Sequence, residues 1–319
     1  MDRPWQTMPG RLLAVLLLAT LLVACGQSGG AAPSPNETAD GSPASTTDAP
    51  PTPATDAPTT EPAGDASDLL VEVTNRGTLL IATDANYKPQ SFKNPDGSWE
   101  GFDIDVAREI ANRLGVEAEF LDISFDVVTA GSWNDRWDIN VGSMTVTEER
   151  KEALLFTTPY YYTPASFVVH QDSSAASIDD LAGKKVGVGA ATTYLDYLNG
   201  TLVLAGEEIR TAAPQTEVQV YDADLLAIAD LALGDGARLD AVLIALPTAE
   251  NAISEEQPLK ILGAPVYYEA LGVVLDKSST LNSQSLTAEI SRIIEEMRSD
   301  GILAELSMKY YGVDITSKQ

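Results

Sequence analysis

The stretch EVQVYDADLLAIADLALGDGARLDAVLIA, residues 217–245, decides the fold class of this chain. Residues 217–221 form a strand-like run, 224–233 carry leucine, isoleucine and alanine at helical spacing, and 239–245 form a second apolar run. A strand, a helix and a strand in this order predict a βαβ unit. The stretch therefore indicates an α/β protein.

The same alternation continues on both sides of this stretch. Short apolar runs predict further strands, and amphipathic segments that stop at Gly115 and Gly301 predict helices. The expected strands are 79–83, 118–123, 138–143, 166–170, 185–190, a strand around Ile261, and 271–275. The expected helices are 104–114, 284–299 and 302–310, with a short helical turn that Ser177 can cap.

The composition excludes several classes of protein. The 319 residues include one cysteine and one histidine, which excludes a disulfide scaffold and a zinc site of the Cys/His kind. The chain has 47 acidic and 20 basic side chains and a net charge of −27, which excludes a diffuse basic surface for nucleic acid. We expect no cofactor and no metal, and a monomer.

Residues 1–24 have the features of a secretory signal. Arg3 and Arg11 precede the apolar run 12–23, which is shorter than the roughly 20 residues that a membrane-spanning helix needs. The run ends in LVAC at 22–25, which resembles the bacterial lipobox. The resemblance implies that Cys25 is the lipid attachment site and that the protein is extracytoplasmic and anchored to a bacterial membrane. The alternative is an ordinary signal peptide with a chance cysteine.

The next segment, 25–68, is predicted to be a disordered acidic tether. Residues 26–68 contain eight prolines and seven acidic residues, and no lysine, arginine or aromatic residue. Such a segment cannot bury enough apolar surface to offset the entropy lost on ordering. Residues 69–319 remain for the folded body, and they retain a net charge of about −21.

Several segments of this body share one pattern. They are TDANYKP at 83–89 with GSWEGFDID at 97–105, DINVGSMTVTEER at 138–150 with FTTPY at 156–160, LAGKKVGV at 181–188 with the threonines at 192 and 193, and EMRSDG at 296–301 with KYY at 309–311. Together they resemble the polar-amino-acid binding proteins of ABC importers, solute-binding protein family 3. The resemblance extends over about residues 73–313.

This resemblance implies a two-lobed periplasmic-binding-protein fold of type II. The chain is expected to cross between the lobes near 163–166 and near 263–268, so that 69–164 and 266–319 form one lobe and 165–265 the other. A small-molecule ligand, a polar amino acid or a related carboxylate-bearing compound, is expected in the cleft. Hinge closure would trap it, and an ABC permease would receive the closed form.

The resemblance also implies the ligand-binding residues. Arg150 corresponds to the arginine that holds the ligand α-carboxylate, for which a guanidinium offers a planar pair of donors. Ser143 and Thr145 follow an expected strand, where they either contact the ligand or cap a loop. Thr192 and Thr193 open an expected helix, as ligand contacts or as a plain N-cap.

A second group of candidates follows the first expected strand. Asp84 and Tyr87 correspond to cleft positions, and Phe125 corresponds to an aromatic residue that stacks on the ligand side chain. Two aromatic rings beside a carboxylate suit a cationic side chain. For Phe125 the alternative is core packing, and for Trp133 and Trp137 packing within a lobe is the expected role.

One position departs from the family pattern. Family members place an aspartate, which holds the ligand ammonium, five residues after the aspartate that begins the D-A strand, whereas this chain has Ala245 there. A buried ammonium without a counter-charge is costly. Either another acid (Asp222, Asp84 or Glu250) or a slip in register replaces it, or the ligand is not an ordinary α-amino acid.

Two other functions compete with solute binding. Some proteins of this fold are secreted dehydratases that act on cyclohexadienyl acids, but the sequence contains no evident nucleophile–base pair, and His170 lies on an expected strand. We therefore expect no enzyme. A ligand-sensing module is the other alternative, and it would need a separately encoded signalling partner.

Overall fold

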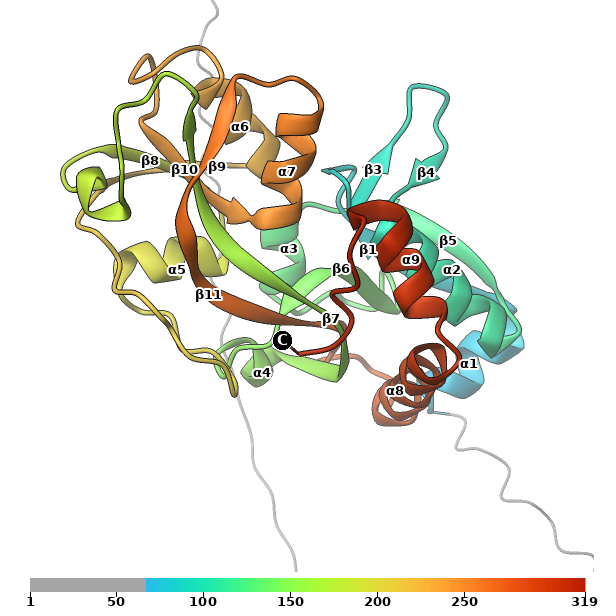
Figure 1. Ribbon diagram of the computed structural model, residues 1–319. Coiled ribbons are helices and arrows are strands. Elements are labelled where there is room, and N and C mark those ends of the chain that lie inside the picture. Colours follow the sequence, from blue (N-terminus) through green and yellow to red (C-terminus); the bar gives the residue numbers. More distant parts are fainter. Residues whose placement is uncertain (1–66, 319) are drawn as a thin grey trace, which may run out of the picture. The chain divides into compact units, whose positions relative to one another are not determined.

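The computed structural model describes residues 67–318 (Figure 1). The expected signal at 1–24, Cys25 and the expected tether as far as residue 66 lie outside the described residues. Asp68, which the sequence assigned to the tether, caps the first helix, because its carboxylate accepts hydrogen bonds from the backbone N–H groups of Leu70 and Val71. In the described part of the chain, no helix is both long and apolar enough to cross a membrane.

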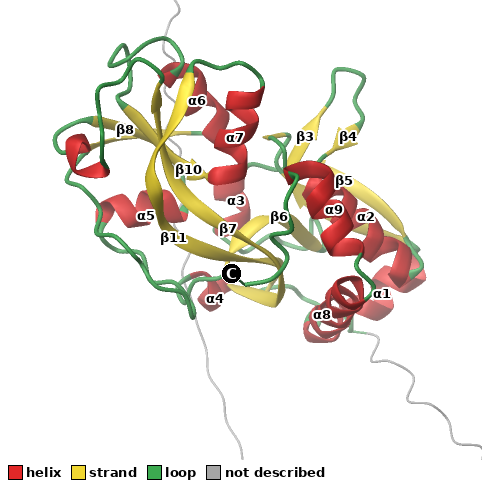
Figure 2. Cartoon of the chain, viewed as in Figure 1, coloured by secondary structure: helices red, strands yellow, loops and turns green. Residues whose placement is uncertain are grey.

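Eight strands form one mixed sheet, in the order β5-β1-β6-β11-β7-β10-β8-β9. Their bounds are β1 Thr78–Thr83, β5 Glu117–Asp122, β6 Ile139–Thr145, β7 Leu154–His170, β8 Lys185–Gly189, β9 Glu217–Tyr221, β10 Ala241–Ala245 and β11 Leu259–Asp276. Strands β5, β1 and β6 are parallel, and so are β10, β8 and β9. The long antiparallel pair of β7 and β11 joins these two halves (Figure 2).

Helices cover both halves of the sheet. In Figure 1, α1, α2, α8 and α9 gather near β1 and β5, whereas α5, α6 and α7 lie near β8 and β10. The bounds of the helices are α1 Leu69–Arg76, α2 Phe102–Leu114, α3 Phe125–Thr129, α4 Arg150–Ala153, α5 Thr193–Asn199, α6 Asp224–Leu231, α7 Leu246–Ser254, α8 Gln284–Ser299 and α9 Ile302–Tyr311, with a 3₁₀ turn at Ile178–Leu181. A small antiparallel sheet adds β2 Asn86–Tyr87, β3 Ser91–Lys93 and β4 Trp99–Glu100.

Each half of the sheet has its own apolar core. In the half around β1, residues such as Ile81, Phe102 and Ile293 are fully buried against one another. In the half around β8, Phe167 and Val188 belong to a separate buried cluster. These separate cores agree with a two-lobed α/β fold. The lobe boundaries at 164/165 and 265/266 remain a prediction.

Gly101 at the start of α2 illustrates a local constraint of this fold. Its φ is 133°, and a Cβ there would lie 2.2 Å from the backbone oxygen of Gln90. Only glycine lets the small sheet approach the start of α2 this closely. The approach fixes the start of α2, and Asp103 lies in its first turn.

The structure corrects one detail of the expected elements. The sequence predicted that a strand ends at residue 143 and that Ser143 and Thr145 lie beyond it, but both residues belong to β6. Ser143 has a left-handed φ of 54°, yet the strand continues because Met144 and Thr145 pair with β11. The loop-capping alternative for these two residues is therefore wrong.

Candidate functional site

The carboxyl ends of several parallel strands, from both halves of the sheet, face one cavity. Strands β1 and β6 reach it from one half, and β8 and β9 from the other. Open α/β sheets place their ligand sites at such strand ends. The cavity is lined by all eight residues that the sequence singled out: Asp84, Tyr87, Phe125, Ser143, Thr145, Arg150, Thr192 and Thr193. Their role as ligand contacts stays a prediction.

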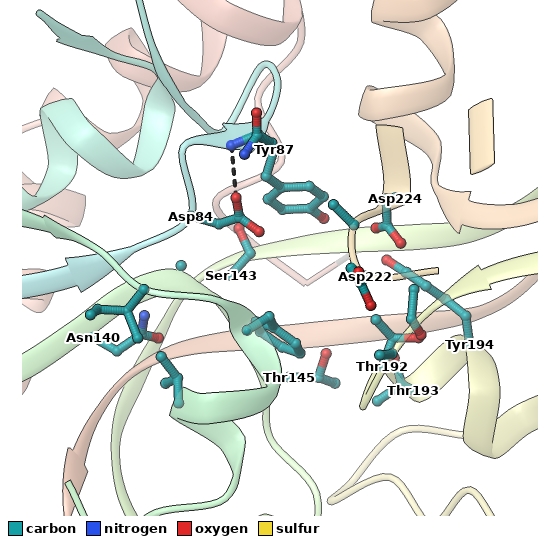
Figure 3. A pocket seen from close by; sticks show the side chains of 18 of the residues that line it. Asp84, Tyr87, Asn140, Ser143, Thr145, Thr192, Thr193, Tyr194, Asp222 and Asp224 are labelled. Carbon is teal, nitrogen blue, oxygen red and sulfur yellow. Dashed lines mark hydrogen bonds between the residues drawn. The ribbon is translucent and has the colours of Figure 1, made fainter. Parts of the chain in front are cut away.

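Further residues on the cavity wall were missed in the sequence. They are Asn86, Ile123, Val128, Asn140, Gly142, Gly189, Ala190, Tyr194, Ala223, Asp224 and Glu269; Asp222 was named only as a possible replacement acid. Figure 3 shows Asp84, Asn140 and Ser143 on one side, and Asp222, Asp224 and Tyr194 on the other. The two sides come from different halves of the sheet.

Arg150 connects the two sides of the cavity. It begins α4, its side chain is buried, and its guanidinium donates to the backbone oxygen of Thr145 at 3.1 Å and of Ala191 at 2.8 Å. The guanidinium also lies 5.3 Å from the ring centre of Phe125. Burial lowers the pKa of Arg150, and the nearby Glu269 opposes this shift. A guanidinium has five N–H donors, so donors remain for a ligand carboxylate.

Glu269 is the main acid that sequence reasoning missed. It lies on β11 where this strand passes between the halves of the sheet, and it is buried. Its carboxylate accepts hydrogen bonds from Thr145 at 2.7 Å, from Tyr194 at 3.0 Å and from Thr193. Burial raises its pKa, and these hydroxyls oppose the shift. No local signal points to Glu269, because no short motif surrounds it and only the pairing of β11 with β7 brings it to the cavity.

Asp224 brings a second buried carboxylate to the cavity. It begins α6, and burial raises its pKa to about 7, with Asp84 and Glu269 adding to the shift and the backbone N–H of Gly189 opposing it. Burial also raises the pKa of Asp84, although Asp84 accepts a hydrogen bond from the backbone N–H of Asn86 at 2.7 Å. The lining residues thus include four acids, the fourth being Asp222, and one arginine.

The hydroxyl of Ser143 is already engaged. It donates to Asp103 at 2.7 Å and accepts from Tyr161 at 2.5 Å. Asp103 also accepts from Tyr160 at 2.8 Å, and its pKa is about 6 because burial raises it more than these hydroxyls lower it. Ser143 therefore forms part of the wall, with its side chain directed into a buried polar network.

The two threonines of α5 differ in what their hydroxyls do. Thr192 is the N-cap, since its hydroxyl accepts from the backbone N–H of Leu195 and donates to the backbone oxygen of Gly189 at 2.7 Å. Its hydroxyl therefore acts as the plain cap that was one of the two expectations. Thr193 instead donates to Glu269 across the cavity.

Ala245, which stands where the family pattern has an aspartate, lies outside the cavity. Ala245 ends β10, where it pairs with Ala165 of β7, is fully buried, and is not among the lining residues. Glu250 lines a different cavity, beside Pro247 and Tyr311, so it does not replace the missing acid. Asp84 and Asp222 do line the cavity, and Asp224 and Glu269 add two acids that were not considered.

Two tryptophans behave as expected from the sequence. Trp133 and Trp137 are buried in one apolar cluster, with ring centres 5.3 Å apart. Phe125 packs at the edge of the same cluster and also lines the cavity. Core packing thus describes the surroundings of Phe125, and its stacking on a ligand side chain stays a prediction.

The chain resembles known proteins over most of its described length. Residues 79–313 match the family described as bacterial extracellular solute-binding proteins, family 3. The chain is similar to the L-cystine-binding protein TcyJ of Escherichia coli (strain K12), with 33% identity over 251 residues, 78% of this chain and 88% of that protein. It is also similar to the L-arginine-binding protein of Pseudomonas aeruginosa, with 29% identity over 246 residues, 74% of this chain and 89% of that protein.

Solved structures give the same result. An ancestral arginine-binding protein bound to arginine matches with a TM-score of 0.64 and 32% identity, over 74% of this chain and 99% of that chain. An ancestral amino acid-binding protein, described as a precursor of cyclohexadienyl dehydratase, matches with a TM-score of 0.65 and 28% identity, over 76% of this chain and 99% of that chain. The expected type II fold is confirmed, and the relatives named here are binding proteins rather than enzymes.

Proposed function

Because this chain belongs to the bacterial extracellular solute-binding proteins of family 3, we propose that it is the solute-binding component of an ABC importer and that its ligand is a polar α-amino acid. The names of the relatives support this class of ligand, since they bind cystine and arginine. The cavity is the proposed binding site. It combines a buried arginine with several carboxylates, which matches the two opposite charges of an α-amino acid.

The position of Arg150 is the observation that carries the proposal. Its backbone partners, Thr145 and Ala191, come from opposite sides of the cavity, and they orient the guanidinium between them. A ligand carboxylate could accept hydrogen bonds from the remaining N–H groups of Arg150. It would then lie between the two sides of the cavity. We propose that the α-carboxylate of the ligand accepts these hydrogen bonds from Arg150.

Asp224 is our proposed partner for the ligand ammonium, in place of the acid that is absent at Ala245. Glu269 already accepts hydrogen bonds from three hydroxyls, whereas the contacts of Asp224 include a backbone N–H and repulsion from other acids. An ammonium beside Asp224 would relieve this repulsion and form a charge-assisted hydrogen bond.

We propose that the same contacts support closure of the cleft. Thr193 and Thr145 both donate to Glu269, and Arg150 reaches Ala191, so contacts between the sides converge on the cavity. A ligand that adds contacts to both sides binds the closed form better and shifts the population toward it. We propose that the permease recognises this closed form.

The remaining parts of the proposal concern location and chemistry. We propose that Cys25 carries a lipid and that the acidic segment after it tethers the binding protein outside the cytoplasm, as a monomer. We also propose binding without catalysis. The ancestral protein described as a precursor of a dehydratase is itself called an amino acid-binding protein, which favours binding.

A thermal-shift screen tests the proposed function. Polar L-amino acids at micromolar to millimolar concentration are expected to raise the Tm of the purified protein, since a ligand that binds only the folded state stabilises it. Arg150→Ala should abolish this rise by weakening binding about 100-fold or more. Arg292→Ala, which removes an exposed arginine on α8, is the matched control and should retain the full rise. If no amino acid stabilises the protein, or Arg150→Ala responds like the control, the proposal is wrong.

A further inference from the structure

Asn140 has an unsatisfied oxygen in the wall of the cavity. It lies on β6, is only 2% exposed, and donates from Nδ2 to the backbone oxygen of Ala82 on β1 at 2.9 Å. Its Oδ1 has no hydrogen-bond partner among residues 67–318. Buried polar atoms in native proteins nearly always have a partner, and leaving one without a partner is costly.

The orientation of this amide is fixed by its surroundings. Rotating it by half a turn would put Oδ1 against the carbonyl oxygen of Ala82, so the donor must remain on that side. Gly142 leaves room for it, because a Cβ at this position would lie 2.9 Å from Nδ2. These contacts orient the amide of Asn140 so that its Oδ1 is left without a hydrogen bond. Asn140 lines the cavity (Figure 3).

The surroundings of Asn140 favour a cationic donor. Asp84 lies on the same side of the cavity (Figure 3), and the apolar residues Ile123 and Val128 also line the cavity. The carboxylate of Asp84 and the amide oxygen are both acceptors. With Arg150 matched to the ligand carboxylate, the lining acids leave an excess of negative charge that an acidic or purely apolar side chain would not satisfy.

We propose that Asn140 Oδ1 accepts a hydrogen bond from the end of the ligand side chain, and that the ligand is an amino acid whose side chain ends in a cation with N–H donors. This inference rests on the proposed function, because it assumes that the carboxylate of an amino acid occupies Arg150. It makes Asn140 a specificity-determining residue. Its oxygen, without a partner in the protein, acquires one only when the correct side chain enters.

Isothermal titration of the ligand-stripped protein with L-arginine and L-lysine tests this inference. The wild type should bind at least one of them, and Asn140→Leu, which has a similar volume but no acceptor, should weaken that binding about tenfold or more. Asn140→Asp should retain binding within about threefold, because one carboxyl oxygen still accepts from the ligand while the other, protonated, donates to Ala82. Thr83→Val is the matched control. Its hydroxyl is likewise buried without a partner, but Thr83 does not line the cavity, so binding should be unchanged.

The outcomes separate this inference from the proposed function. If Asn140→Asp loses as much affinity as Asn140→Leu although it keeps both an acceptor and the donor to Ala82, the acceptor oxygen does not carry the binding and the inference is wrong. If the wild type binds amino acids with neutral or acidic side chains but neither cation, the inference is wrong and the proposed function stands. If no amino acid binds at all, both are overturned.

Discussion

Two buried aspartates begin helices in the two halves of the sheet, and they differ in their partners. Asp103 in the first turn of α2 accepts hydrogen bonds from Ser143 and Tyr160. Asp224 at the start of α6 faces the cavity, with a backbone N–H as its opposing contact and with Asp84 and Glu269 as unfavourable neighbours. Burial raises the pKa of both, to about 6 for Asp103 and about 7 for Asp224.

The difference shows how two acids in similar positions serve different purposes. The hydroxyl groups around Asp103 satisfy its carboxylate within the protein, so Asp103 holds the side chains of Ser143 and Tyr160 in place. Among residues 67–318, Asp224 has a backbone N–H but no side-chain donor, so its ionised form is satisfied fully only when a cation from outside binds. A polar group that the fold leaves without a partner, and that points into a cavity, is therefore the better candidate for ligand contact.

Replacing Asp224 should have the largest effect. Asp224→Asn is expected to weaken amino acid binding about 100-fold, because it removes a buried charge opposite the ligand ammonium. The same change should raise the Tm of the unliganded protein at pH 8 by roughly 5 °C, since it removes a buried charge. Titration calorimetry and thermal unfolding at pH 8 measure both. Loss of stability together with unchanged affinity would mean that Asp224 is a structural acid like Asp103.

The dependence of stability on pH has a definite sign for these two groups. Their pKa values in the folded state lie above the ordinary value of 3.8. Their contribution to stability is therefore fully present below about pH 3.8 and is lost as the pH rises through about 6 for Asp103 and about 7 for Asp224. The stabilising effect of Asp224→Asn should accordingly be larger at pH 8 than at pH 5.

The affinity for the ligand should rise with pH, whereas the stability contribution of Asp224 falls as the pH rises. A ligand ammonium lowers the pKa of Asp224 from its value of about 7, so binding releases a proton when the group starts protonated. Affinity should then fall by up to about tenfold for each pH unit below 7. Titration calorimetry from pH 5.5 to 8.5, in buffers of different ionisation enthalpy, measures the proton release. Asp224→Asn is the control, and an equally steep dependence in this variant would contradict the assignment.

Replacing Asp103 should have the smallest effect on binding. Asp103→Asn keeps one acceptor oxygen but leaves one of the two hydroxyls without its ionised partner, so we expect a loss of about 1 kcal/mol in the free energy of unfolding. Affinity should change by no more than about threefold. Tyr160→Phe, which removes one donor to the same carboxylate, should give a similar stability loss. A large loss of affinity at unchanged stability would mean that Asp103, like Asp224, acts in ligand binding, which contradicts the assignment.

Much of the fold could be predicted from the sequence. The strands that line the cavity, and the helices α2, α8 and α9, follow from local periodicity and from stop signals such as Gly115 and Gly301. The short helices α1, α3 and α7 and the small sheet were not predicted. Helix α3 and the strands of the small sheet have five residues or fewer, which is too short for a periodic pattern. Pro247 at the start of α7 reads as a break although it is favourable in a first helical turn.

The α/β class follows from local periodicity, and the acidic character of the folded body follows from composition. The resemblance of short motifs to the family supplied the eight residues that line the cavity. Which polar groups have partners depends on the tertiary structure. Glu269 reaches the cavity because β11 runs between the two halves, Asp224 because α6 starts at the edge of the sheet, and Asn140 keeps a free oxygen because Ala82 takes its donor. Whether a polar atom is satisfied depends on groups distant in sequence, and therefore no local pattern reports it.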